Sequence, residues 1–267
     1  MIMCQRIKGL NIAFISMVIL SSSLWAKGSV STQLEDSELL NIAGKQRMLS
    51  QRIAKDYLYI GKNIAKSKAS RELREAMEQF LQTHETLTKS INNPEIKNLL
   101  EFVALSTGEF KELSNEEFSL ENAQLILDLS ESMLEGSQYV FDSLKNELHI
   151  KEVEIIAIAA KERMLSQRIA KYYISYQSGI KDKNSVEMMK ETVKQFGDNL
   201  STLINNSSNT PEINKKLAEI NKLWQIVHKF YINIEKGGLP LIVFNTTDNI
   251  TKKMDEVTKL YLKKNSK

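Results

Sequence analysis

Arg47–Lys55 reads RMLSQRIAK, and the same nine residues return unchanged at Arg163–Lys171, 116 residues further along the chain. Little else in the chain repeats so closely. Packing alone tolerates many exchanges between apolar side chains of similar volume. The unchanged mixture of Arg, Ser and Gln therefore indicates that the polar side chains of these two repeated segments share a task.

Apolar residues surround each repeated segment at the spacing of an amphipathic helix. They are Ile42, Leu49, Ile53, Ile60 and Ile64 around the first copy, and Ile158, Leu165, Ile169, Tyr173 and Ile180 around the second. The chain has only 3 Pro and 10 Gly in 267 residues, which favours helices over sheets. We predict an all-α protein of two tandem antiparallel four-helix bundles, module one at 31–148 and module two at 149–267.

Capping signals predict where the helices of module one begin and end. The first helix is expected to start at the capping box Thr32–Glu35 and to run to about Lys66. Ser70 opens the second helix. Asn93 is the expected N-cap of a third helix with Pro at its first position, and a break near Ser114–Ser119 leads into the fourth.

The connection between the modules has no clear stop signal. Residues 120–178 contain no proline, and Gly136 is their only glycine. This predicts one long continuous helix that joins the modules and stacks them end to end. A tight turn near Asn146–His149 is the alternative.

The first 26 residues have the order of charge and hydropathy of a secretory signal peptide. Arg6 and Lys8 precede the apolar run 10–20, and Ala26 ends a short polar region. An uncleaved membrane anchor is the alternative, since residues 9–26 are uncharged and just long enough to span a bilayer. Cleavage would leave a cysteine-free periplasmic protein of net charge +1, which gives no sign of nucleic-acid binding.

Small side chains accompany Arg47 and Arg163 on one helix face, roughly opposite the apolar stripe. Small residues allow another helix to approach closely, so an arginine there would meet that helix or something trapped against it. The expected interface residues are Ala43, Gln51 and Ala54 in module one, and Ala159, Ala160, Gln167 and Ala170 in module two.

Residues 41–52 fit the pattern N-x-A-G-x-x-R-M-x-S-x-R. This resembles the periplasmic P-box of NarX-type nitrate/nitrite sensors, and equally the PilJ-type N-terminal domain of type IV pilus methyl-accepting chemotaxis transducers. The resemblance implies a sensory four-helix bundle whose first helix carries the box. It covers both modules, in two tandem copies, although its specific part is the box alone.

The resemblance also implies a site. In nitrate-binding members the box arginine and the backbone at the box glycine hold the anion where two first helices meet, which names Arg47 and Gly44. A guanidinium fork matches a planar oxyanion. The other candidate ligand-binding residues are Asn41, Ser50, Arg163 and Ser166. Module two has Ala157 and Ala160 where the pattern has Asn and Gly, so we expect Arg47 to matter more for binding than Arg163.

The sequence contains no nucleophile–base set, phosphate loop or metal-ligand spacing, so we expect no enzyme, catalytic residue, metal or cofactor. We expect a periplasmic protein that binds a small anion such as nitrate or nitrite and signals through a membrane-bound sensor or chemoreceptor. The alternative is a structural or adaptor module that docks on such a receptor. If the modules stack end to end, a homodimer that pairs Arg47 across its interface follows.

Overall fold

The computed structural model describes residues 34–150, 152–236 and 238–265. These residues form helices and no strands, which confirms the all-α prediction. In module one the helices are α1 (Asp36–Gly61), α2 (Lys66–Ser90), α3 (Pro94–Leu113) and α4 (Leu120–Glu147). In module two they are α5 (Val153–Ser178), α6 (Lys183–Ile204), α7 (Pro211–Ile232) and α8 (Pro240–Asn265), with a 3-10 turn, η1, at Ile234–Lys236.

Local chemistry explains several helix ends. The Asn93 side chain accepts hydrogen bonds from the backbone N–H groups of Glu95 and Ile96, so the predicted cap of α3 is confirmed. The predicted end of α1 near residue 66 is wrong: the helix stops at Gly61, and Asn63 and Ala65 then take left-handed backbone angles. The proposed cap at Thr32 lies outside the described residues.

The predicted continuous helix between the modules is wrong. Helix α4 ends at Glu147, and Leu148 takes an extended conformation. Helix α5 begins at Val153 after Glu152, whose φ of 52° is left-handed. Because the chain reverses here, α5 returns along the molecule instead of extending it. The reversal lies close to the alternative turn at 146–149.

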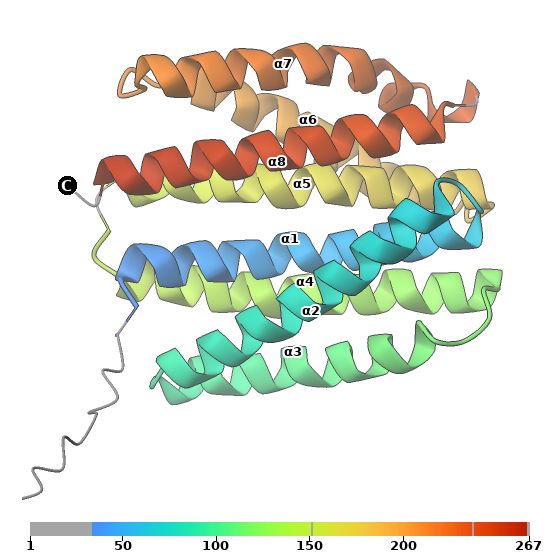
Figure 1. Ribbon diagram of the computed structural model, residues 1–267, viewed down its shortest axis with the longest axis horizontal. Coiled ribbons are helices and arrows are strands. Elements are labelled where there is room, and N and C mark those ends of the chain that lie inside the picture. Colours follow the sequence, from blue (N-terminus) through green and yellow to red (C-terminus); the bar gives the residue numbers. More distant parts are fainter. Residues whose placement is uncertain (1–33, 151, 237, 266–267) are drawn as a thin grey trace, which may run out of the picture. The chain divides into compact units, whose positions relative to one another are not determined.

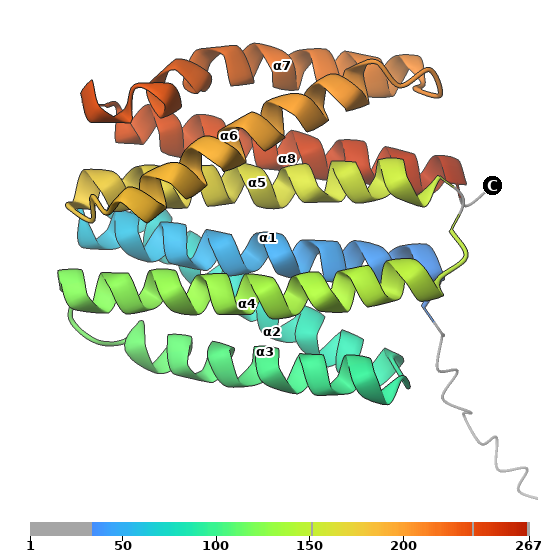
Figure 2. The same ribbon diagram turned by 180° about the vertical axis from the view of Figure 1, so that it is seen from behind.

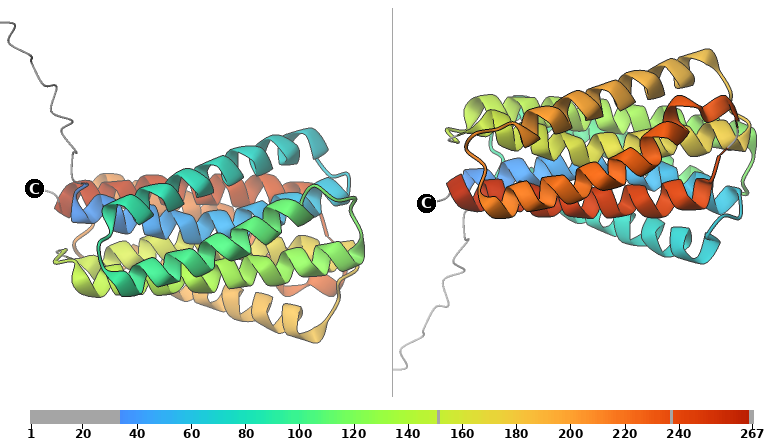
Figure 3. Two further views of the ribbon diagram at one scale, coloured as in Figure 1. Left: turned by 90° about the horizontal axis from the view of Figure 1, so that it is seen from below. Right: turned by 90° about the horizontal axis from the view of Figure 1, so that it is seen from above.

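The modules therefore lie side by side and not end to end. Helices α1 and α5 run next to each other in the same direction, with α4 flanking α1 and α8 flanking α5 (Figures 1 and 2). Helices α2 and α3 lie together on one side of these four, and α6 and α7 on the opposite side (Figure 3). The two repeated segments are consequently brought into one interface inside a single chain.

The hydrophobic core is continuous across this arrangement. Phe80 and Phe196, which occupy matching positions in α2 and α6, are both fully buried. Tyr59 of α1 stacks on Phe244 of α8, with ring centroids 4.3 Å apart, so aromatic packing crosses from one module to the other. Residues 33–267 form one compact unit, and the division at 148/149 stays a prediction. Within the described residues, no helix is long and apolar enough to cross a membrane.

Candidate functional site: a buried polar seam between the repeated segments

Helices α1 and α5 lie close together where the box pattern has its glycine. A Cβ atom added to Gly44 would lie 3.1 Å from the Cβ of Ala160, its counterpart on α5, and 3.1 Å from Nη2 of Arg163. Contacts this short require a neighbour to move, so Gly44 permits a spacing that a larger residue would widen. The expected interface alanines are all buried: Ala43, Ala54, Ala159, Ala160 and Ala170.

The last residue of each repeated segment, a lysine, joins one module to the other. Lys55 on α1 donates to Asp248 on α8, with Nζ 2.6 Å from Oδ1. Lys171 on α5 pairs with Glu131 on α4, and its Nζ lies 3.0 Å from Ser130 Oγ. Both lysine side chains are fully buried. We call the two cross-module ion pairs, Lys55–Asp248 and Lys171–Glu131, together with the arginines that contact them, the polar seam.

The second arginine of each repeated segment belongs to the same polar seam. Arg52 lies 3.3 Å from Glu72 of α2 and 3.9 Å from Asp248, and Arg168 binds Glu131. Burial opposes ionisation of Glu131, but Lys171 and Arg168 outweigh it and lower the pKa of Glu131 to about 2.

Both terminal nitrogens of the Arg163 guanidinium have partners, while its buried Nε has none among the described residues. Its Nη1 donates to Asp255 Oδ1 of α8 at 2.6 Å and to Asn41 Oδ1 of α1 at 3.1 Å. Nη2 also reaches the carbonyl oxygen of Asn41 at 3.5 Å. The guanidinium is fully buried, yet its charge is compensated by a carboxylate and an amide.

Arg47 has a different environment although it occupies the equivalent position. Its guanidinium lies 3.6 Å above the ring of Phe141 on α4, and Nη1 donates to Gln138 Oε1 at 2.7 Å. Gln138 stands 117 residues before Asp255, so an amide replaces the carboxylate that Arg163 has. Among the described residues, Arg47 has no ion-pair partner, and its buried Nε and Nη2 have no hydrogen-bond acceptor. Burial, and then the charge of Arg163, lower the pKa of Arg47.

A cavity of about 210 Å³ adjoins Arg47 between α4, α5 and α6. It contains a second cation, Lys161, which is half-buried and has no ion-pair partner among the described residues. Burial, and then the charge of Arg47, lower the pKa of Lys161. The other residues of the cavity wall are Gln138, Phe141, Asp142, Lys145, Glu154, Ala157, Ile158 and Asn199.

The remaining candidate site residues fall into two groups. Asn41 and Gly44, which the resemblance assigned beside Arg47, contact Arg163 instead. Ser50 and Ser166 donate to the carbonyl oxygens of the arginines three residues earlier in their own helices. None of these four lines the cavity at Arg47.

The two glutamines of the repeated segments fix neighbouring helices. Gln51 donates to the carbonyl oxygen of Ser130 on α4 at 2.9 Å, and Gln167 donates to Thr251 on α8 at 2.7 Å. The sequence reasoning missed Gln138 and Lys161, which complete the surroundings of Arg47. A signal for Lys161 was present, because Lys45 stands at the equivalent position of module one.

Comparison with known proteins agrees with part of the resemblance. Residues 29–106 match the family model described as type IV pili methyl-accepting chemotaxis transducer N-term, PilJ. No curated protein and no solved structure matches the chain. The match covers α1, α2 and part of α3, and the second copy in module two stays a prediction. Residues 29–106 are thus similar to a PilJ-type domain, which suggests a sensory or signalling role.

Proposed function

We propose that this protein is a periplasmic sensory module that binds a small anion at Arg47 and signals through a membrane-bound sensor or chemoreceptor. Nitrate and nitrite are the first candidates, because the box at 41–52 is of the kind that holds them in similar domains. The PilJ-type match supports the sensory part of this proposal. The secretory character of residues 1–26 supports the periplasmic location, although these residues lie outside the described part of the chain.

One observation carries the anion proposal: among the described residues Arg47 is a buried cation with no ion-pair partner, and it borders a cavity. Leaving a charged donor buried without an acceptor is costly. An anion between Arg47 and Lys161 would satisfy the free N–H groups and remove the repulsion between the two cations. Arg163 offers no such vacancy, because Asp255 already occupies the equivalent place.

Binding at this position could be transmitted because the cavity lies between helices of both modules. Gln138 belongs to α4 of module one and Lys161 to α5 of module two. A ligand that draws these helices together binds one arrangement of the modules better than another, and differential affinity is what shifts a conformational equilibrium. The adjacent polar seam would resist any shift that breaks its buried ion pairs.

The polar seam also favours the alternative function. The side chains of Lys55 and Gln51, like those of Lys171 and Gln167, donate hydrogen bonds to other residues of the same chain. Packing of the two modules can therefore by itself explain the repeated segments. A structural or adaptor module that docks on a receptor needs no ligand. The earlier reason for a homodimer is removed, since Arg47 and Arg163 already share one interface within a single chain.

Isothermal titration calorimetry with nitrate and nitrite distinguishes the two functions. We expect one anion per chain, with affinity at least tenfold lower in Arg47→Ala because one charge-assisted hydrogen bond contributes about 1.5–3 kcal/mol. Arg163→Ala is the matched control and should weaken binding less. Absence of binding by any small anion to the folded protein would favour the adaptor function, which a pull-down from membranes then tests.

A further inference from the structure

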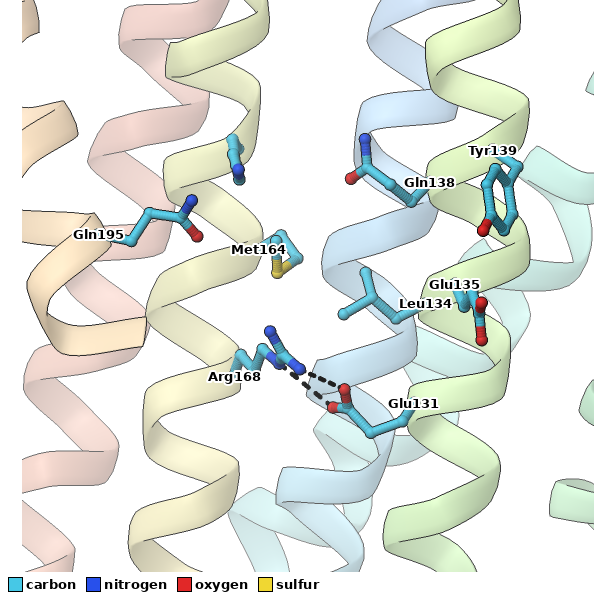
Figure 4. A pocket seen from close by; sticks show the side chains of 9 residues that line it. Glu131, Leu134, Glu135, Gln138, Tyr139, Met164, Arg168 and Gln195 are labelled. Carbon is cyan, nitrogen blue, oxygen red and sulfur yellow. Dashed lines mark hydrogen bonds and ion pairs between the residues drawn. The ribbon is translucent and has the colours of Figure 1, made fainter. Parts of the chain in front are cut away.

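A groove of about 450 Å³ continues from the Arg47 cavity along α4 and α5. The two spaces share Gln138 and Lys161, which line both. The groove alone falls within the size range of small-molecule sites. Figure 4 shows Gln138 toward one end, the Arg168–Glu131 ion pair toward the other, and Leu134 and Met164 between them.

The two ends of the groove differ in the side chains that line them, and helix geometry gives the distance between these ends. Gln138 and Glu131 are seven residues apart on α4, which corresponds to about 10 Å at 1.5 Å per residue. The end at Gln138 holds the cations Arg47, Lys145 and Lys161, which outnumber the carboxylates Asp142 and Glu154 there. Leu134 and Met164 give the middle its apolar surface, and Glu135, Tyr139 and Gln195 complete the wall. The far end is closed by the compensated Arg168–Glu131 pair.

An equivalent groove of about 440 Å³ lies between α1, α2 and α8. Met48, Arg52 and Gln79 stand in it where Met164, Arg168 and Gln195 stand in the first groove. Its counterpart of Gln138 is Asp255, which already holds Arg163. Because Arg163 is already paired with Asp255, only the first groove leaves its arginine, Arg47, without an ion-pair partner among the described residues.

We propose that the ligand is an elongated organic anion, a carboxylate with an apolar chain up to about 10 Å long. Its carboxylate lies between Arg47 and Lys161, and its chain lies in the groove against Leu134 and Met164. This inference rests on the proposed anion site and names the class of ligand that the site takes. Nitrate or nitrite would fill only the cavity at Arg47 and leave the groove empty.

The test is a calorimetric series of nitrate, acetate, butanoate and hexanoate on the full chain. Affinity should rise about fourfold with each methylene buried in the groove. Gln195→Trp, which fills the groove from an exposed position on α6, should reduce the ratio of hexanoate to acetate affinity to about one. Gln79→Trp, the same change in the other groove, should leave that ratio unchanged.

The outcomes separate the two proposals. If nitrate and acetate bind and hexanoate binds no better, the anion site stands and the elongated ligand is wrong. The inference would also be overturned if Arg47→Ala did not weaken hexanoate binding. It would equally be overturned if Gln79→Trp abolished the increase in affinity from acetate to hexanoate as fully as Gln195→Trp does. If no anion of the series binds, both proposals fail.

Discussion

Exchange of Gln138 for Glu would give Arg47 the partner that Arg163 already has. Gln138 Oε1 accepts from Arg47 Nη1 at 2.7 Å, and Glu has nearly the same shape, so the new carboxylate needs no rearrangement. A hydrogen bond between two charged groups contributes about 1–2 kcal/mol more than one to a neutral acceptor. The variant loses the bond from Gln138 Nε2 to the exposed Asp142 and gains a repulsion of about 1 kcal/mol there.

The net effect on the free energy of unfolding should therefore be small, within about 1 kcal/mol of zero. Anion affinity should fall at least tenfold, because an anion must displace a carboxylate that is attached to the protein and already in place. Guanidinium chloride unfolding measures the first quantity, with an unchanged m-value as the check on two-state behaviour. Calorimetry with nitrate and hexanoate measures the second.

Asp255→Asn is the reciprocal variant. It removes the carboxylate from Arg163, which keeps Asn41, and should cost about 1.5–3 kcal/mol of stability. Equal anion affinity in Gln138→Glu and the unaltered protein would refute the reasoning, because the missing counter-charge at Arg47 would then have no part in binding.

Three further changes test the surrounding packing. Lys171→Ala should destabilise the protein by about 3 kcal/mol in guanidinium chloride unfolding, because Glu131 loses one of its buried partners; a loss below about 1 kcal/mol would contradict the role of the pair. Burial raises the pKa of Glu162, whose only hydrogen bond among the described residues comes from Asn199, so the native carboxyl resists ionisation as pH rises above its unfolded pKa near 4.3. Glu162→Gln should thus stabilise the protein at pH 8 and not at pH 3, by about 1.4 kcal/mol for each unit by which the native pKa of Glu162 exceeds its unfolded pKa. Equal shifts of the melting temperature at pH 8 and pH 3 would contradict this prediction. Gly44→Ala should lower the free energy of unfolding by about 1 kcal/mol, because crowding of the new methyl group against α5 outweighs the gain in helix propensity. A stabilised variant would mean that α1 and α5 are spaced more widely than described.

Much of the helical architecture could be predicted because its signals are local. The apolar stripes around the repeated segments, and the cap at Asn93 before Pro94, depend on residues within a few positions of one another. The connection could not be predicted in the same way. Leu148–Glu152 contains no Pro or Gly, and Glu152 takes a left-handed conformation that its own side chain does not favour. Packing of α5 against α1 determines the reversal there.

The sequence singles out Arg47 as a candidate site residue but does not predict the residues that surround it. Arg47 was identified from the repeated segment, but its partners Gln138 and Phe141 lie on α4, more than 90 residues away, and no local pattern connects them. Lys55 and Lys171 were missed because a lysine on a predicted helix is normally solvated. Their complete burial depends on carboxylates supplied by the other module.

Helices α1 and α5 lie in parallel within one chain, and a disulfide between Gly44→Cys and Ala160→Cys tests this arrangement directly. The added Cβ at residue 44 lies 3.1 Å from that of Ala160, slightly closer than the usual 3.5–4.5 Å, so a small adjustment allows the bond. Cys4, the only native cysteine, is replaced by Ser, and Gly44→Cys alone serves as the control. After mild oxidation, we expect a monomer whose peptides containing residues 44 and 160 are linked within the chain. Linkage only between chains, or none at all in the folded protein, would contradict the account.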